Sequence, residues 1–504
     1  MVTTSRQQYA NIDLLKAGLT SGLPYVLKDD RVVLFSPYSY KLWEFPSQFL
    51  ETPELEEAIL VNRLAGLPYS FLGTSQGVMK IGLVLSTTCN MECSYCYLEG
   101  SESQTSLDIK TIDQVMAYLF DQHPSIVCIH VFGGEPTLYI KELFYLLNFL
   151  EKECIPFIAH VNSNGTAPTS IYSELVSRGV CFTISSDGLP QVHDKLRPYK
   201  GGHGTAKTVE NCLQILSVQN MPFIVRTTIV PENLNSFYRA IDYWADLGVK
   251  YVHFEADSNL QNANDFNITQ VSPSIYVKKV LQAIEIASYR NIFIISSAYM
   301  NLLHPSSRFC TLCAIGGFLI NTDLSLSACY KVQNQSKQNP FIIGQWNSQL
   351  SVPSISYNRK DFLGQINVES FKSCTFCHAK YICSGGCPNR NYYSKGVWFN
   401  VEPWICEVKK LLVEDAIWKI FESARKNFWP VVCGYDHYAA TLIKSKKIAD
   451  SIIVQDMQTS LSIEQSLNSD SSKEIISAIE YRLDWLQMEA LALAKILDRS
   501  ESCL

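Results

Sequence analysis

Six short apolar runs, each followed by a helical pattern, most constrain how this 504-residue chain can fold. The runs are rich in β-branched residues, as buried strands are. They cover residues 81–86, 126–132, 157–162, 180–185, 223–229 and 251–255. Parallel strands need helical crossovers, so this order predicts a parallel α/β sheet with its chemistry at the carboxyl ends of the strands.

Three cysteines stand directly after the first of these strands. Cys89, Cys93 and Cys96 form a C-x3-C-x2-C run, with Tyr95 just before the last cysteine. A [4Fe-4S] cluster normally takes four cysteines, so three on a short loop leave one iron open to an outside ligand. For the triplet alone, a zinc knuckle and buried packing cysteines are the alternatives.

This triplet resembles the signature of the radical S-adenosylmethionine (SAM) superfamily, in which the amino and carboxylate groups of SAM chelate the fourth iron. The resemblance implies a partial (βα)6 barrel, and the strand count agrees with it. Tyr95 supplies the family's aromatic residue. Gly133-Gly134-Glu135, after the second strand, is similar to the family's GGEP motif, whose backbone and glutamate hold the SAM amino group. A Gly-Gly turn also lets a backbone approach a ligand closely, because no Cβ intervenes.

Later strand ends carry further parts of the resemblance. The turn at residues 162–166 is similar to a T-N-G-T turn, with serine where threonine is usual. Residues 185–197 resemble the S-x-D-G-x4-H-D-x2-R stretch of the SPASM branch, which implies that Ser185 lies near SAM. Arg226 stands where the family places a partner of the SAM carboxylate, with a structural salt bridge as the alternative. For His193 the alternative is a structural hydrogen-bonding role.

A second cysteine field has the spacing of the SPASM extension. Its eight cysteines suffice for two closed [4Fe-4S] clusters. The family arrangement implies that the first auxiliary cluster is held by Cys310, Cys313, Cys329 and Cys387, and the second by Cys374, Cys377, Cys383 and Cys406. Leu324 replaces a glycine that the family carries before the third upstream cysteine. Zinc remains the alternative here, because paired C-x2-C units are common in zinc ribbons.

Four domains are expected along the chain. They are a small leading domain (1–78), the radical SAM core (79–300), the SPASM domain (301–412) and a helical carboxyl-terminal extension (413–504). The leading domain should contain a hairpin with strands at 25–27 and 32–35 and a helix at 53–61, an order that resembles leader-peptide recognition elements; a simple cap is the alternative. Helical patterns cover 408–428 and 474–498, with a polar linker at 458–472.

Composition limits the classes of partner. A net charge of −6 with mixed surface charges gives no basic stripe for nucleic acid. The first twenty residues lack the apolar core of a signal peptide, and no run of about 18 apolar residues predicts a membrane span, so a cytoplasmic protein is expected. Seventeen cysteines in a reducing compartment point to metal binding rather than disulfides. The six scattered ones are expected to be packing residues.

These features lead to a hypothesis of function. The resemblance implies a maturase of ribosomally made peptides that uses a 5'-deoxyadenosyl radical to form a thioether, a carbon-carbon crosslink or a similar oxidised product, with flavodoxin or ferredoxin as electron donor. A sulfatase-maturing enzyme is the alternative, but in that group an aspartate follows the third upstream cysteine, and here Tyr330 does. Two further hypotheses are an enzyme that oxidises an aminoglycoside-like alcohol and a cluster-bearing scaffold without activity.

Overall fold

The computed structural model describes residues 25–28, 30–36, 41–47, 78–96, 98, 105–124, 126–153, 156–219, 221–256, 268–302, 306–310, 318–332, 338–375, 377–396, 398–426, 431–446 and 479–482. They contain one eleven-stranded sheet and one four-stranded sheet.

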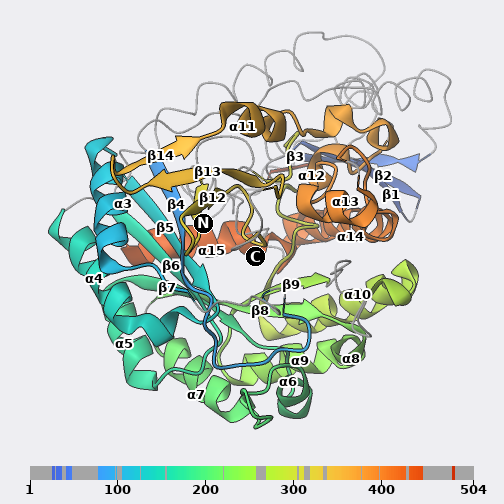
Figure 1. The fold of residues 1–504 in the computed structure, drawn as a ribbon. Coiled ribbons are helices and arrows are strands. Elements are labelled where there is room, and N and C mark those ends of the chain that lie inside the picture. The colour runs from blue at the N-terminus through green and yellow to red at the C-terminus, as the bar shows by residue number, and fades with distance from the viewer. Residues whose placement is uncertain are drawn as a thin grey trace.

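The six expected parallel strands are neighbours in the large sheet, which confirms the parallel α/β fold. They are β4 (Val78–Ser86), β5 (Ile126–Gly133), β6 (Phe157–Ser163), β7 (Val180–Ser185), β8 (Phe223–Ile229) and β9 (Tyr251–Ala256). A seventh strand that the sequence did not predict, β10 (Phe293–Ile295), pairs in parallel with β9. Figure 1 shows the helices forming an arc outside these strands.

The crossover helices form where apolar residues recur at helical spacing. They are α3 (Ile109–Asp121), α4 (Ile140–Lys152), α5 (Thr169–Ser177), α6 (Pro190–Leu196), α7 (Ala206–Ser217), α8 (Pro231–Leu234), α9 (Phe237–Asp246) and α10 (Pro273–Arg290). Asp108 caps α3 by accepting a hydrogen bond from the Thr111 N–H at 2.7 Å, which satisfies a group that the first turn leaves without a helical partner. Among the described helices, none is long and apolar enough to cross a membrane.

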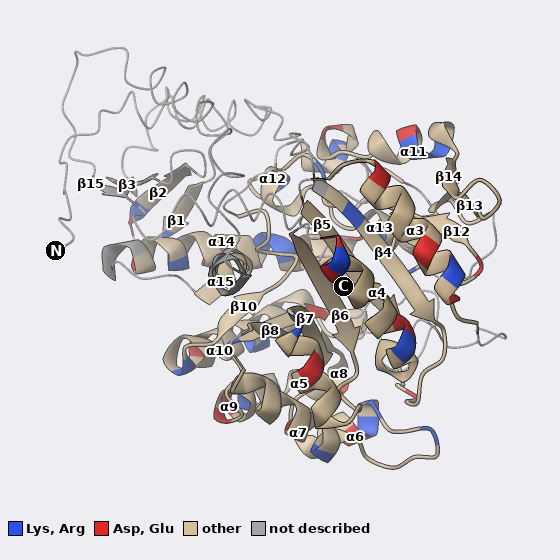
Figure 2. Ribbon diagram, turned by 90° about the vertical axis from the view of Figure 1, so that its left-hand side faces the viewer, with Lys and Arg blue, Asp and Glu red and all other residues tan. Residues whose placement is uncertain are grey.

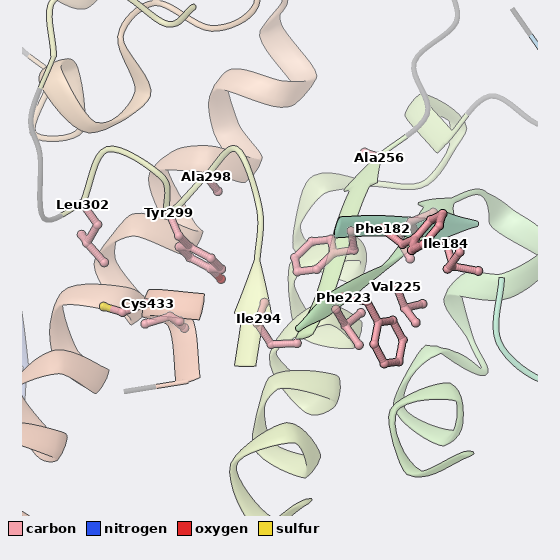
Figure 3. Packing of buried hydrophobic residues seen from close by; sticks show 14 of the residues in the cluster. Phe182, Ile184, Phe223, Val225, Ala256, Ile294, Ala298, Tyr299, Leu302 and Cys433 are labelled. Atoms are coloured by element: carbon pink, nitrogen blue, oxygen red, sulfur yellow. The ribbon is translucent and has the colours of Figure 1, made fainter. Parts of the chain in front are cut away.

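Alternate strand residues divide the sheet into two faces. Phe182 and Ile184 on β7 and Phe223 and Val225 on β8 belong to the main buried cluster, and Figure 3 shows these side chains close to one another. Burying a side chain of this size stabilises a fold by about 1.5–3 kcal/mol. This face of the sheet therefore supplies stability, and the other face is left for the site.

Helix α15 (Gly434–Lys446) closes the amino-terminal end of the barrel interior. Inward-facing residues near the amino-terminal ends of the strands form a second buried cluster with this helix. The strand residues are Ile126, Cys128, Ile158, Cys181, Ile224 and Tyr251, and the helix residues are Tyr435, Tyr438, Ala439 and Leu442. The Tyr251 hydroxyl lies 2.9 Å from both His437 Nδ1 and Thr441 Oγ1. The His437 ring also stacks on Phe293 at 3.7 Å, so this histidine is structural. A ligand must therefore enter from the carboxyl ends of the strands.

The cysteine-rich region continues the same sheet, because β11 (Phe318–Ile320) pairs in parallel with β4. Strands β12 (Ser325–Ser327), β13 (Ile342–Asn347) and β14 (Val352–Ile355) follow in antiparallel order. Leu324 in the β11–β12 turn has φ 66°, the left-handed conformation that favours glycine. The turn thus has a conformation in which glycine is usual, although leucine stands here.

Short helices complete this region: α11 (Tyr357–Gly364), α12 (Lys380–Cys383), α13 (Pro388–Lys395) and the long α14 (Pro403–Lys426). The 3₁₀ helices are η2 (Pro136–Tyr139), η3 (Ile268–Gln270), η4 (Val368–Ser370), η5 (Lys372–Cys374) and η6 (Val431–Cys433). Because α14 runs through residue 412, the expected boundary between the last two domains lies inside a helix.

The small sheet consists of β1 (Tyr25–Lys28), β2 (Arg31–Ser36), β3 (Lys41–Pro46) and β15 (Ile479–Arg482). Its first two strands are the expected hairpin. The helix expected over 474–498 is wrong at 479–482, where β15 pairs antiparallel with β3; the local Ile-Glu-Tyr-Arg alternation has the period of a strand. The helix expected at 53–61 lies outside the described residues.

The small sheet packs on α14, as Figure 2 shows. Lys28 Nζ and the Arg31 guanidinium each lie 4.9 Å from the centre of the Trp418 ring on that helix. Cation–π contacts and the stems of the two long side chains thus join the leading domain to the cysteine-rich region.

The scattered cysteines pack in the apolar interior, as expected. Cys128, Cys181, Cys212 and Cys433 are at most 3% exposed and belong to buried apolar clusters. Cys154 and Cys503 lie outside the described residues.

Candidate active site

The first three cysteines lie in the loop after β4, at the carboxyl end of the barrel. Backbone hydrogen bonds join this loop to the segment after α6: Glu92 N–H donates to Pro198 O at 2.9 Å, and Ser94 N–H donates to Leu196 O at 3.0 Å. The loop is therefore held at a defined position over the open end of the barrel.

The cysteine thiols are arranged for a cationic ligand. Burial raises the pKa of Cys89, and it raises the pKa of Cys93 to about 12. The Met91 N–H, 3.4 Å from Cys89 Sγ, and the charge of Arg197 near Cys93 act in the opposite direction. Cys96 is close enough to raise both pKa values further. Each thiolate makes ionisation of the neighbouring thiols less favourable. All three cysteines can therefore ionise together only when a positively charged metal centre, such as the irons of a cluster, binds them.

The two glycines of the GGEP motif bring their turn against the cysteine loop. A Cβ at Gly133 would lie 2.2 Å from Ser86 O, and one at Gly134 would lie 2.3 Å from Thr88 O. Gly134 N–H donates to Ser86 O at 2.8 Å, and Glu135 N–H donates to Thr88 O at 2.9 Å. From the sequence, we expected the two glycines to let the backbone approach a ligand. The structure shows that they let the turn pack closely against the backbone of Ser86 and Thr88.

Glu135 ties this turn to the next one. Its carboxylate is buried, and Oε1 accepts hydrogen bonds from Thr137 N–H, Thr137 Oγ1 and Ser163 Oγ at 3.0, 2.6 and 2.9 Å. Oε2 accepts one from Asn164 N–H at 2.6 Å. Burial raises the pKa of Glu135, and these hydrogen bonds oppose the rise. The contact of Glu135 with the SAM amino group stays a prediction. Oε2 accepts fewer hydrogen bonds than Oε1, so it is the oxygen with more capacity for such a contact.

The turn at residues 162–166 reaches the first cysteine. Asn164 Nδ2 donates to Asn90 Oδ1 at 2.8 Å and lies 3.8 Å from Cys89 Sγ. Asn90 Nδ2 donates to Thr166 Oγ1 at 2.9 Å. Ser163, at the position where the family has threonine, keeps a hydroxyl in the network through its bond to Glu135, so the substitution preserves this connection.

A buried carboxylate, Asp187, binds the cysteine loop through a hydrogen bond from Tyr95. It accepts hydrogen bonds from Arg197 Nε at 2.8 Å, from Thr227 Oγ1 at 3.2 Å, from Thr228 N–H at 3.3 Å and from the Tyr95 hydroxyl. The Arg197 guanidinium also lies 5.2 Å from the centre of the Tyr95 ring. Burial raises the pKa of Tyr95 well above its usual value, so the phenol keeps its proton. Tyr95 is thus anchored within the chain, and its contact with a cofactor stays a prediction.

His193 has the structural role that the sequence left as its alternative. Its Nδ1 accepts a hydrogen bond from Asp187 N–H at 3.1 Å, and its Nε2 lies 3.1 Å from Thr205 Oγ1. Burial lowers the pKa of His193 to about 4. The ring is therefore neutral at pH 7, with the proton on Nε2, where it donates to Thr205.

Ser185 and Arg226 are neighbours on the inner face of the barrel. Ser185 pairs in register with Arg226, and Arg226 pairs with His253, so the three side chains point to the same side. Both expected residues therefore lie at the open end of the interior. Their contacts with SAM stay predictions.

Glu255 is a carboxylate on the inner face of the barrel that the sequence analysis did not single out. It accepts hydrogen bonds from His253 Nε2 at 3.3 Å and from the Ser297 hydroxyl at 2.7 Å. Burial raises the pKa of Glu255, but the hydrogen bond and charge of His253 and the charges of Arg226 and Lys409 lower it to about 2. Arg226 thus has an acidic neighbour, as its structural alternative required. The signal was a carboxylate within an otherwise apolar strand.

The described cysteines of the first auxiliary group come together from three segments. Burial raises the pKa of Cys329, and the nearby Cys387 and Cys310 raise it further. Cys310 packs in a buried cluster with Phe132 and Tyr330, whose rings are 4.3 Å apart. Cys313, the fourth expected ligand, lies outside the described residues.

The four cysteines of the second auxiliary group also come together. Burial raises the pKa of Cys374 to about 12, and Cys383, Cys377 and Cys406 each act to raise it. The described cysteines thus lie near one another in two sets, and their roles as cluster ligands stay predictions.

In the described part of the chain, no group of three or more Cys, His, Asp or Glu side chains is arranged to hold a metal ion. The choice between iron–sulfur clusters and zinc at the auxiliary cysteines therefore stays a prediction.

A three-cysteine loop lies over the open end of a parallel barrel, with two more cysteine groups beside it. Residues 83–244 match the model of the radical SAM superfamily, whose members bind a [4Fe-4S] cluster and SAM, so the chain contains a radical SAM domain. The buried, mutually opposed thiols of the loop fit such a cluster.

Known proteins are similar to parts of the chain. It is 28% identical over 183 residues to the uncharacterized protein MJ0907 of Methanocaldococcus jannaschii, a match that covers 36% of this chain and 63% of that protein. It is 32% identical over 171 residues to the sporulation killing factor maturation protein SkfB of Bacillus subtilis, covering 33% of this chain and 39% of SkfB. Each match spans less than two thirds of the relative.

A solved structure shares the fold. The structure of anSMEcpe with bound AdoMet and the Kp18Cys peptide superposes with a TM-score of 0.58 at 16% identity, over 69% of this chain and 99% of that one. The radical SAM domain expected from the cysteine triplet is confirmed by the family match, and the solved structure shares the fold that the resemblance implied.

Proposed function

We propose that this protein is a radical SAM maturase of the SPASM type that modifies a peptide or protein in the maturation of a ribosomal peptide product. The observation that carries the proposal is the grouping of the SPASM cysteines beside the radical site. Phe309 and Cys310 pack in one buried cluster with Val84 and Phe132, which lie near the ends of β4 and β5. The first auxiliary group therefore adjoins the open end of the barrel.

Two auxiliary groups suit an oxidative crosslink. When bound, the cluster and SAM supply a 5'-deoxyadenosyl radical, which takes a hydrogen atom from a substrate carbon. If a thioether forms, the substrate sulfur loses a proton, the carbon–sulfur bond forms and one electron is released. Four cysteines per auxiliary cluster leave no open iron, so these groups are suited to accept that electron rather than to bind substrate.

Residues of the chain define where the substrate carbon must lie. Helix α15 closes one end of the interior, so the substrate enters between the strand ends and the cysteine-rich region. Arg226, Ser185 and Glu255 line the inner face there and are each partly exposed, so a bound substrate would displace water from this end of the interior. The barrel thus orients the substrate, while the hard chemistry belongs to the cofactors.

The relatives support a peptide substrate. SkfB is a maturation protein for a killing factor, and anSMEcpe was solved with a peptide. In this proposal the small sheet, β1 to β3, binds part of the substrate peptide, and the electron donor is a flavodoxin or ferredoxin. The protein works in the cytoplasm, where reducing conditions keep its thiols free.

Sulfatase maturation is the second candidate, supported by the fold of anSMEcpe. The base expected of that group is an aspartate after the third upstream cysteine. Here Tyr330 holds that position, is 4% exposed and packs on Phe132. No carboxylate stands there to take a proton, so we favour the crosslinking maturase.

Formation of 5'-deoxyadenosine by anaerobically reconstituted protein tests the proposal. The wild-type protein with SAM and a reductant should form it, and Cys93→Ala should not; a wild-type protein that never forms it is a scaffold. Reconstituted protein should hold about 12 irons per chain, from three four-iron clusters. A variant without β1 to β3 should keep 5'-deoxyadenosine formation and lose peptide modification; unchanged modification would contradict the role of the small sheet.

A further inference from the structure

Two cations of the cysteine-rich region reach the barrel beside Glu255. Arg390 on α13 donates from Nη2 to Ala256 O at 2.8 Å, and Ala256 directly follows Glu255 at the end of β9. Lys409 on α14 donates from Nζ to Ser297 O at 3.2 Å, just after β10. Ser297 in turn donates from its hydroxyl to the Glu255 carboxylate at 2.7 Å. Both cations therefore lie at the carboxyl rim of the barrel, next to one carboxylate.

A third cation, Arg226, lies on the barrel side of Glu255. Arg226 on β8 and Glu255 on β9 both point to the inner face of the sheet. Burial raises the pKa of Glu255, and the charges of Arg226 and Lys409 are among the causes that lower it. Burial also raises the pKa of the Tyr276 phenol; the charge of Glu255 raises it further, and that of Arg390 lowers it. The three cations thus share Glu255 as a neighbouring carboxylate.

The charges of Arg390 and Lys409 are not paired with a carboxylate among the described residues. Their hydrogen bonds go to backbone carbonyls, and the Lys409 ammonium also lies 4.3 Å from the centre of the Phe309 ring. Glu255 accepts its hydrogen bonds from a hydroxyl and an imidazole instead. Lys409 is 2% exposed, and a buried cation is costly unless an anion lies near it. The excess of positive charge therefore favours a further anion at this point of the rim.

This part of the rim can be reached by a substrate. Arg226 and Glu255 are partly exposed, and so is Arg390. The proposed substrate path runs between the strand ends and the cysteine-rich region, and Arg390 joins these two parts of the protein. A guanidinium carries five N–H donors, and Arg390 uses Nη2 for its bond to Ala256. Donors therefore remain for a planar anion such as a carboxylate.

We propose that Arg390, supported by Lys409, forms a subsite for a carboxylate of the substrate peptide, which is either an acidic side chain or the carboxyl terminus. The SAM carboxylate is expected at Arg226, so a substrate carboxylate is the second anion at this rim. The subsite holds one charged point of the peptide beside β9 and thereby limits which carbon can face the radical. The inference rests on the proposed function, in which the substrate is a peptide.

Isothermal titration calorimetry with four short peptides tests the subsite. One pair is acetyl-Gly-Gly-Glu-Gly-Gly-amide and its glutamine counterpart, and the other is acetyl-pentaglycine with a free carboxylate or with an amide. Each is titrated into the full-length, anaerobically reconstituted protein in the presence of SAM. One of the two carboxylate peptides should bind about tenfold tighter than its uncharged counterpart. The first pair reports a side chain, and the second reports a terminus.

Variants assign this preference to named side chains. Arg390→Gln should weaken binding of the preferred peptide about tenfold and leave the affinity for SAM unchanged. Arg390→Lys keeps the charge and should bind the peptide more tightly than Arg390→Gln does. Lys409→Met should also weaken it, and if that variant does not fold, Arg390→Gln decides alone. Lys419→Gln is the control, because Lys419 lies further along α14 and 3.8 Å from Asp415; it should change neither affinity.

Equal binding of the carboxylate peptides and their uncharged counterparts would overturn the inference. So would a preference that Arg390→Gln leaves intact, or that Lys419→Gln weakens as strongly. If Arg390→Gln weakens binding of SAM instead, the anion at Arg390 is the SAM carboxylate and the substrate subsite is wrong. Formation of 5'-deoxyadenosine by the wild-type protein without a peptide is measured separately, so loss of the subsite is distinguishable from failure of the proposed radical SAM function.

Discussion

Replacing Asp187 by Asn removes the negative charge that binds Arg197 and Tyr95 beside the cysteine loop, and it keeps the size of the side chain. The Asp187 side chain is fully buried, and that of Arg197 is 10% exposed. Asparagine offers one acceptor oxygen where donors from four residues now bind, and its amide NH2 group would face one of those donors. Asp187→Asn therefore leaves the Arg197 guanidinium buried without its anion.

The expected loss of stability follows from this pairing. Removing one partner of a buried ion pair costs about 3–5 kcal/mol, and we expect Asp187→Asn to lower the free energy of unfolding by that amount. Arg197→Met should cost about 3 kcal/mol, because Asp187 keeps Tyr95, Thr227 and Thr228 as donors. The double variant should cost less than the sum, with a coupling of about 2 kcal/mol between the two sites.

Urea unfolding of the full-length apoprotein, followed by circular dichroism and tryptophan fluorescence, measures these differences. Asp242→Asn is the control, because Asp242 is 45% exposed in its ion pair with Arg290, and such pairs contribute about 0–1 kcal/mol. The reasoning fails if Asp187→Asn costs less than about 1 kcal/mol, or if the two substitutions are additive.

Three further substitutions test other parts of the site. Gly134→Ala places a methyl group 2.3 Å from Thr88 O, so reconstituted protein should lose about four irons. Gly201→Ala is the control for backbone strain: its φ of 97° disfavours alanine, but nothing lies within 4 Å of the new methyl group, and it should keep the irons. In urea unfolding, Leu324→Gly should change the free energy by less than about 1 kcal/mol, whereas Leu324→Val should lower it by about 1–2 kcal/mol, because valine is strained at φ 66°. The pKa of Glu255, about 2 in the folded protein, lies below its ordinary 4.5, so its contribution of about 3 kcal/mol is full above pH 4.5 and is lost as the pH falls toward 2; Glu255→Gln should remove this dependence from unfolding measured against pH.

The strands could be predicted where local pattern and burial agree. The six barrel strands are mainly apolar runs of at least six residues in the fold, long enough to be recognised. β10 has only three residues and forms because β9 offers it a parallel edge. β15 lies within a longer helical pattern, and its partner β3 is more than 430 residues earlier. In both cases the sequence of the strand itself carries no strand pattern that stands out from the neighbouring sequence.

The sequence indicated the candidate ligands of the site but not the residues that support them. Cysteine spacing predicted two auxiliary groups, and the described cysteines of each group lie near one another; their role as cluster ligands stays a prediction. The contacts of Asp187 with Tyr95 and Arg197 join separate segments, and the same residues read in sequence as a turn followed by a charged stretch. Glu255 and Lys409 depend on an encounter between β9 and α14, and no spacing along the chain indicates it.

The buried carboxylates of the site fix the positions of chain segments as well as stabilising the fold. The apolar outer face of the sheet stabilises the barrel, but apolar contacts are non-directional and would not fix a loop to within a fraction of an ångström. Hydrogen bonds to Glu135, Asp187 and Glu255 have definite geometries, and each carboxylate joins segments from different strands. An apolar replacement of any of them could restore stability. It would not restore the position of the segment that the carboxylate holds, so iron content and reduction potential should be more sensitive to these substitutions than the unfolding free energy is.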